Sequence, residues 1–126
     1  MNKEIIYTTN APEPIGPYSQ AVKAGNLLFV SGQVALKPGG NDLANSDIAE
    51  ETNQVMQNLQ SILTEAGMDL SNVVKTTIFL SDMDLFGSVN EIYAKYFNGD
   101  FPARETIAAK GLPKNARVEI SVIAAG

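Results

Sequence analysis

Apolar residues recur at helical spacing in two segments of the chain. The first segment is predicted to begin at the N-cap Asp47, with Glu50 completing a capping box, and to end at Gly67. The second is predicted to lie between a cap at 81–84 and a stop at 98–100. Their apolar stripes are Ile48, Thr52, Val55, Met56, Leu59, Ile62, Leu63 and Ala66, and then Leu85, Phe86, Val89, Ile92, Tyr93, Tyr96 and Phe97. The residues expected to face solvent on the first helix are Gln54, Gln57, Asn58 and Ser61.

Strand-like patterns occupy most of the remaining chain. They are short runs rich in apolar or β-branched residues, separated by glycine and proline turns, at 4–9, 18–23, 27–34, 73–80 and twice within 101–124. The resulting order is β, β, β, helix, β, helix, β, β. This order predicts a single α+β domain over residues 1–126, with a mixed sheet of about six strands and two helices on one face.

The last two strands carry an unusual pair of charges. Period-2 alternation puts Arg104 on one face of its strand, with Glu105 on the other, and sets Glu119 opposite the apolar face of the final strand. A carboxylate in so apolar a strand is costly to bury without a charged or hydrogen-bonding partner, and Arg104 is the nearest candidate. An ordinary cross-strand pair worth about 0.2–1 kcal/mol is the alternative reading.

One sheet with two helices leaves a sheet face uncovered. We expect this face to carry Arg104 and Glu119, and residues such as Ile123 make it too apolar for simple exposure to solvent. We therefore expect a homo-oligomer, with the two charges near a subunit boundary.

Two further residues admit two readings each. Gly32, inside the third strand, marks either a plain bulge or a backbone patch that faces a ligand. Asn90 points away from the centre of its helix's apolar stripe, so it is solvated unless another subunit covers it.

Composition limits the partners, the location and the catalytic groups that can be expected. The net charge of -5 and a pI near 4.6 argue against a nucleic-acid partner. No apolar run approaches the roughly 20 residues of a membrane span, and the N-terminus has no signal-peptide pattern, so a cytoplasmic location is expected. There is no cysteine and no histidine, which excludes thiolate chemistry and the usual general base.

Six short motifs in order along the chain resemble the RidA (YjgF) family of reactive intermediate deaminases. They are Ile15-Gly-Pro-Tyr-Ser-Gln20, Ser31-Gly-Gln33, Val89-Asn-Glu-Ile-Tyr93, Phe101-Pro-Ala-Arg104, Leu112-Pro-Lys114 and Val118-Glu-Ile120. The resemblance runs from about residue 5 to residue 124. It implies a chorismate-mutase-like fold, assembled as a homotrimer with the sheets facing inward and with sites between subunits.

The same resemblance implies hydrolysis of 2-imino and enamino acids, such as 2-aminoacrylate and 2-aminocrotonate, to 2-oxo acids and ammonia. It implies that Arg104 holds the substrate carboxylate and that Glu119 positions or activates water. The substrate-binding residues would be Tyr18, Ser31, the backbone of Gly32 and Thr106, and Asn90. An imine carbon is already electrophilic, so no metal or organic cofactor is expected.

The chain departs from the family pattern beside its arginine. Glu105 stands where a small Ser or Thr is common, and it would repel anionic substrates if a bulge turned it inward. Thr106 stands where many members have Cys. Two alternatives to the deaminase remain: a non-catalytic module that binds a small metabolite or has a regulatory or chaperone-like role, and a chorismate-mutase-type enzyme on the same architecture. The second would need more cationic groups than Arg104 alone, because its substrate is a dianion.

Overall fold

The computed structural model describes residues 2–126. Its strands and α-helices are β1 (Lys3–Ile6), β2 (Ala21–Ala24), β3 (Leu27–Gln33), α1 (Ile48–Glu65), β4 (Val73–Leu80), α2 (Phe86–Ala94), β5 (Ala103–Ala108) and β6 (Val118–Ala125). Three short 3₁₀ turns, η1 (Leu70–Asn72), η2 (Met83–Leu85) and η3 (Pro113–Asn115), lie between them. The order of elements confirms the predicted one.

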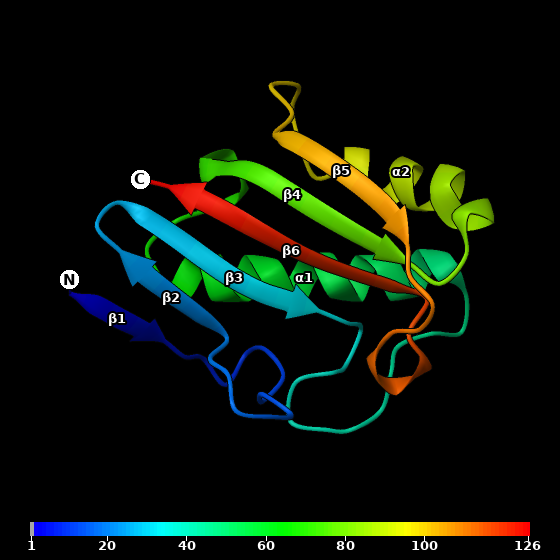
Figure 1. Cartoon of the computed structure of the whole chain (residues 1–126), viewed down its shortest axis with the longest axis horizontal. Coiled ribbons are helices and arrows are strands. Elements are labelled where there is room, and N and C mark those ends of the chain that lie inside the picture. Colours follow the sequence, from blue (N-terminus) through cyan, green and yellow to red (C-terminus); the bar gives the residue numbers. More distant parts are fainter. Residues whose placement is uncertain (1) are drawn as a thin grey trace.

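The strands form a six-stranded sheet in the order β1-β2-β3-β6-β4-β5. Only the β4–β5 pair is parallel, because α2 carries the chain back to the starting edge, and the other pairs are antiparallel. Both α-helices lie on the same side of this sheet, with α2 behind the β5 edge (Figure 1). The predicted α+β fold with a mixed sheet and helices on one face is therefore confirmed. Neither α-helix in residues 2–126 combines the length and apolarity needed to cross a membrane.

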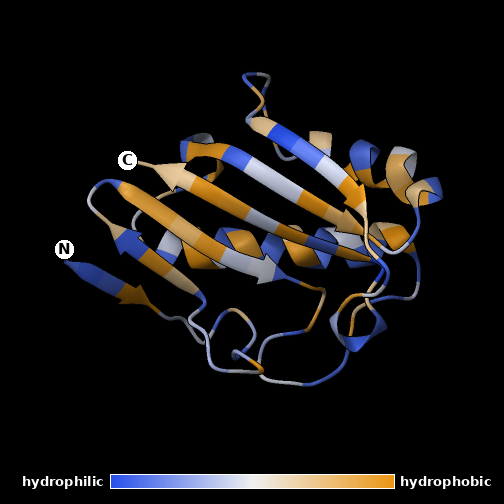
Figure 2. Ribbon diagram, viewed as in Figure 1, coloured by the Kyte–Doolittle hydropathy of each residue, from blue (hydrophilic) through white to orange (hydrophobic). Residues whose placement is uncertain are grey.

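The core lies between the sheet and α1. The helix stripe packs on the inward rows of β3, β4 and β6, where Leu28, Ile78 and Ile120 are fully buried. The predicted start of α1 is confirmed, because Asp47 Oδ1 accepts from Glu50 N at 2.7 Å and Ser46 N donates to Glu50 Oε1. Apolar residues run along most of β3 and β6 (Figure 2).

Asn58 does not face solvent, so that prediction was wrong. It is 1% exposed, and its amide donates to the carbonyl oxygens of Val34 and Leu36 at 3.1 and 2.9 Å. These carbonyls belong to the segment that leaves β3 and can no longer bond within the sheet. A buried amide on the helix satisfies them instead, which holds this segment against α1.

Glu51 also lies inside the protein. Its oxygens accept from the backbone N and the Nε of Arg117, both at 2.7 Å, and Arg117 also donates to the carbonyl of Asn45. Since Glu51 is fully buried, this contact ties the first turn of α1 to the residue just before β6. It therefore fixes the chain two residues before Glu119.

Several element ends differ from the predicted ones. The first two strands are shorter than predicted because Gln20, 2% exposed, uses its side-chain amide to hold the loop between them. It accepts from Thr8 N and donates to the carbonyls of Thr8 and Pro12. The second helix begins at Phe86 because η2 occupies the predicted first turn, where Asp82 caps Asp84 N.

The sheet face without helices is partly apolar. Register aligns Ile5 with Val22, Phe29 and Ile123 in one row across four strands, and Ile5 and Phe29 are 53% and 43% exposed. Exposed apolar rows of this kind are typical of surfaces that meet another protein. This agrees with the expectation that another copy covers the face, which stays a prediction.

Candidate functional site

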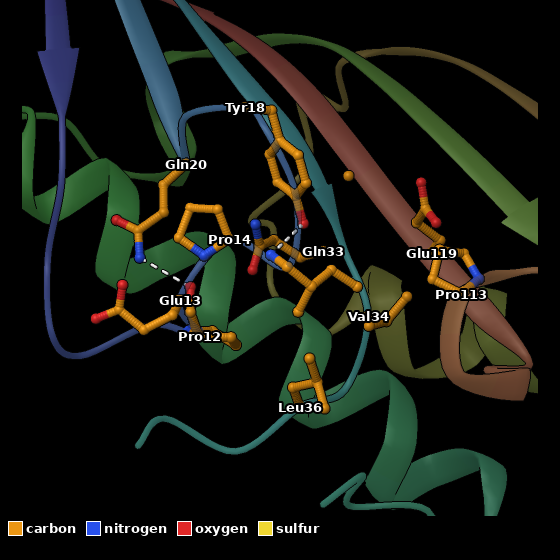
Figure 3. Close-up of a pocket in the computed structure, with 12 residues that line it drawn as sticks. Pro12, Glu13, Pro14, Tyr18, Gln20, Gln33, Val34, Leu36, Pro113 and Glu119 are labelled. Atoms are coloured by element: carbon orange, nitrogen blue, oxygen red, sulfur yellow. Dashed lines mark hydrogen bonds between the residues drawn. The ribbon is translucent and has the colours of Figure 1, made fainter. Parts of the chain in front are cut away.

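Glu119 projects from β6 into a hollow at the end of β3. The hollow is lined by Pro12, Glu13, Pro14, Ile15, Tyr18, Gln20, Gly32, Gln33, Val34, Leu36, Pro113 and Glu119 (Figure 3). Tyr18 and Glu119 lie on either side of β3 in this view. The hollow thus brings the carboxylate of Glu119 together with Tyr18 and Glu13, which come from a segment about a hundred residues earlier in the chain.

Gly32 leaves room for the Glu119 side chain. Register slips between Val30, opposite Val122, and Gln33, opposite Ile120, so Ser31 and Gly32 form a bulge. A Cβ on Gly32 would lie 2.2 Å from Glu119 Oε2. The bulge at this glycine is therefore confirmed, and the Glu119 carboxylate occupies the space that a side chain would need. That its backbone faces a ligand stays a prediction.

Within residues 2–126, Glu119 forms no salt bridge with a cation. It also takes part in none of the side-chain hydrogen bonds of this part of the chain. Burial raises the pKa of its carboxyl above the ordinary value of 4.5, because the anion loses part of its hydration. A carboxylate held in this way is a stronger base than one in water, which suits it to take a proton from a water molecule.

Tyr18 stands in the loop before β2 and is 47% exposed. Its hydroxyl accepts from Ile15 N at 3.2 Å, so its ring is tied to the loop that forms one wall of the Glu119 hollow. Ser31 lies in a neighbouring hollow with Lys75 and Thr77, and its hydroxyl donates to the carbonyl of Ser19 at 2.6 Å. The structure therefore brings Tyr18 and Gly32 to Glu119, but not Ser31.

Arg104 lies on the other side of the sheet from Glu119. In register it is aligned with the buried Thr76, on the face that α2 covers. Its guanidinium carbon lies 5.1 Å from the centre of the Tyr93 ring and 5.7 Å from that of Phe86. Glu119 instead belongs to the row of Phe79 and Ile107, on the open face.

The expectation that Arg104 and Glu119 share the uncovered face was therefore wrong. The physical reason is the register of β5 against β4, which assigns Arg104 to the inward row and Glu105 to the outward one. Glu105 pairs with Lys75 at 2.8 Å on the open face, so it does not turn toward Arg104.

Arg104 has its own hollow, at the β5 edge. Asn90, Tyr93, Ala94, Phe101, Pro102 and Arg104 line it, so Asn90 accompanies the arginine and not the carboxylate. Thr106 follows on the same face of β5, and its hydroxyl oxygen is buried without a hydrogen-bond partner within residues 2–126. Sequence reasoning assigned Phe86 and Tyr93 to the helix stripe alone, and the exposure of Phe86 becomes visible only in the fold.

The protomer thus carries two half-sites on opposite faces of its sheet. One offers a cation beside aromatic rings, and the other offers a carboxylate beside a phenol. A molecule as small as an amino acid cannot contact both within one copy. Residues 2–126 also contain no cluster of three or more acidic residues placed to hold a metal ion.

Replacing Gly32 with alanine should lower the activity of the Glu119 half-site without unfolding the protein. The added methyl group would displace the Glu119 carboxylate, which is the end of a flexible side chain, and a 1 Å misplacement can cost about 100-fold in rate. The measurement is steady-state hydrolysis of an imine, which is the activity that the family resemblance implies, together with the thermal unfolding midpoint. Gly16→Ala is the matched control, because its Cβ would meet the Tyr18 ring at an ordinary 3.5 Å. Equal activity of the two variants would contradict the role given to Gly32.

Comparisons with known proteins identify the family of the chain. The family model described as endoribonuclease L-PSP matches residues 8–126. A mouse protein named 2-iminobutanoate/2-iminopropanoate deaminase is 49% identical over 122 residues, covering 97% of this chain and 90% of the mouse protein. A Yersinia pestis structure, titled as a protein of unknown function of the conserved Rid protein family, has a TM-score of 0.95 at 46% identity and covers 99% and 100% of the two chains. Escherichia coli TdcF with bound serine has a TM-score of 0.93 at 32% identity, covering 98% of each chain. The chain therefore belongs to the RidA (YjgF) family, whose model bears the L-PSP name.

Proposed function

We propose that this protein hydrolyses small 2-imino acids and their enamine tautomers, such as 2-aminoacrylate and 2-aminocrotonate, to 2-oxo acids and ammonia. The observation that carries the proposal is the pair of uncompensated charges. Arg104 lies in a hollow with no carboxylate bound to it, and Glu119 lies in another with no cation bound to it, within residues 2–126. The name of the mouse relative supports the same reaction.

Each charge has a role in this reaction. Arg104 binds the substrate carboxylate through two parallel N–H···O bonds. Ionised Glu119 takes a proton from water as the water oxygen attacks the carbon of the protonated imine, which gives a neutral carbinolamine. Protonated Glu119 then returns that proton to the amino nitrogen. As the C–N bond breaks, the hydroxyl oxygen becomes the carbonyl oxygen and its proton passes through Glu119 to the departing ammonia. Water and the protonated imine are consumed and 2-oxo acid and ammonium are formed, so Glu119 is regenerated.

The other site residues would contact the substrate around these two groups. Tyr18 and the Gly32 backbone belong to the Glu119 side, and Asn90 and Thr106 to the Arg104 side. Ser31 would act through the loop that its hydroxyl holds, because that hydroxyl already donates to Ser19.

The two half-sites would have to come from different copies of the chain. They lie on opposite faces of one sheet, so we propose that Arg104 of one copy and Glu119 of the next complete one site in a homotrimer. The exposed apolar row on the open face supplies a surface for this contact.

Mixing two inactive variants should restore activity if sites form between copies. Arg104→Ala supplies an intact Glu119, and Glu119→Gln supplies an intact Arg104. Random assembly of equal amounts would complete about one quarter of all sites, and about one third of the sites in trimers that carry both tags, because each site draws its two groups from neighbouring copies. The measurement is imine hydrolysis after co-expression with two affinity tags. Activity no higher than that of either variant alone would contradict the shared site.

The direct test of the reaction is ammonia release from an imino acid generated in situ by an amino-acid oxidase. Wild-type protein should accelerate this release above the rate in buffer, and Arg104→Ala serves as the inactive control. Equal rates with and without the wild-type protein would refute the proposal.

A non-catalytic binding module is the second candidate, and the serine bound to TdcF favours it. Such a module would bind 2-oxobutyrate or an amino acid without turnover, which calorimetry combined with the ammonia assay would reveal. A ribonuclease, which the family model's description names, is not what we propose. The net charge of -5 disfavours a polyanion, and the chain has no histidine to serve as the base.

A further inference from the structure

The two arginines of the chain are held in different ways. Arg117 donates from its Nε to the buried Glu51, so its charge is neutralised within the protomer. Arg104 forms no salt bridge within residues 2–126 and contacts the rings of Phe86 and Tyr93 instead. The neighbouring Glu105, which could have paired with it, lies on the other face with Lys75.

The two rings are themselves fixed in place. The Tyr93 hydroxyl donates to Thr76 Oγ1 at 2.9 Å, and Thr76 is the residue aligned with Arg104 on the next strand. Tyr93 is 4% exposed, so its ring is a rigid surface. Phe86 opens α2 and is 39% exposed, so its ring is reachable from the solvent side of the Arg104 guanidinium's surroundings and can be replaced without opening the core.

We propose that Phe86 and Tyr93 are positioning residues that hold the Arg104 guanidinium by cation–π contact in place of an acidic partner. A ring attracts the cation through its π-face and accepts no N–H···O bond, so the guanidinium keeps its donors for a ligand. A carboxylate partner would occupy the same donors and compete with the substrate. This arrangement of rings around the guanidinium favours a small monocarboxylate ligand over a neutral analogue. The proposal rests on the proposed function of Arg104.

A substitution at position 86 should weaken carboxylate binding and leave the chemical step intact. Phe86→Leu keeps an apolar side chain and removes the ring, and the expected loss is about 3- to 10-fold in affinity for 2-oxobutyrate. In turnover the same loss should appear in KM, with kcat nearly unchanged, because the contact acts on binding. Phe86→Trp should retain or improve affinity. The neutral 2-oxobutyramide should bind the wild type and Phe86→Leu equally.

Phe101→Leu is the matched comparison for loss of an aromatic side chain in the same hollow. Phe101 also lines this hollow, but its ring lies tilted against that of Phe97, with the ring centres 5.9 Å apart, and makes no cation–π contact with Arg104 within residues 2–126. Its replacement should cost less affinity than that of Phe86. An equal loss for the two variants would mean that the hollow needs only apolar surface, and it would overturn the proposal.

A second measurement isolates the ring's electrostatics. Phenylalanine analogues with one, two and three fluorine atoms at position 86 weaken the π-face stepwise with little change in shape. The logarithm of the dissociation constant for 2-oxobutyrate should rise with each fluorine. A flat series would overturn the proposal, as would failure of the wild-type protein to bind 2-oxobutyrate. Because calorimetry needs no turnover, an inactive wild type that binds and follows the series would refute the deaminase alone.

Discussion

Replacing Arg104 with alanine should lower kcat/KM for a 2-imino acid by roughly 100- to 10,000-fold. Each hydrogen bond to a charged group is worth about 1.5–3 kcal/mol, and a bidentate clamp makes two of them. The side chain is half-buried at the sheet edge and makes no salt bridge in residues 2–126, so its loss should leave the fold intact. The measurement is steady-state ammonia release, with circular dichroism and the unfolding midpoint as checks on folding.

Arg104→Lys is the sharper comparison for the same site. Lysine keeps the charge but offers neither the planar fork nor good stacking on Phe86 and Tyr93, so a loss of about tenfold or more should remain. Equal activity of the lysine variant and the wild type would show that only the net charge matters. Full activity of Arg104→Ala would remove the carboxylate clamp from the mechanism.

The architecture could be predicted from the sequence because its periodic patterns are long. The apolar stripe of α1 and the runs of β3, β4 and β6 each repeat over several turns or residues, and their order fixes the fold class. The ends of short elements were less certain. Gln20 and η2, which shorten the strands and the second helix, act through side-chain hydrogen bonds that leave no periodic signal.

The placement of the site could be predicted only in part. Alternation correctly separated Arg104 from Glu105 along β5, and Val118 from Glu119 along β6. It could not predict whether Arg104 on β5 and Glu119 on β6 lie on the same face of the sheet. A slip of one residue in the register of β5 against β4 would move Arg104 to the opposite face. Glu51 and Asn58 were missed for a different reason. A polar residue beside an apolar stripe looks solvent-facing until its partner, from a distant segment, is known.

The opposite placement of Arg104 and Glu119 changes how their two charges are interpreted. A cross-strand pair within one protomer, the ordinary reading of Arg104 and Glu119, is not what the structure contains. Each group instead lacks an opposite charge in residues 2–126, and such groups cost stability in an isolated chain. The proposed site shared between copies would account for both, because assembly and substrate together would supply the missing charges.

Replacing Glu119 with glutamine should abolish most of the activity and stabilise the fold at neutral pH. Loss of the base should lower kcat by about 100-fold or more. Burial raises the pKa of Glu119 in the folded protein above its unfolded value, so the folded state binds the proton more tightly. The carboxyl therefore destabilises the fold as the pH rises through the folded pKa, and this cost disappears below the unfolded value. The unfolding midpoint of Glu119→Gln should exceed that of the wild type at pH 7, and the two should converge as the pH falls toward 4.

The same variant tests whether Arg104 of another copy reaches Glu119. A guanidinium beside the carboxyl would oppose the effect of burial, so the gain in midpoint from Glu119→Gln should be larger in an Arg104→Ala background than in the wild type. Two substitutions that act independently would add instead.

The pH profile of activity is a second test of Glu119, because activity should fall as the pH drops through a pKa above 4.5 if burial dominates. A glutamine variant that is fully active, or less stable than the wild type at pH 7, would contradict the role given to this carboxylate.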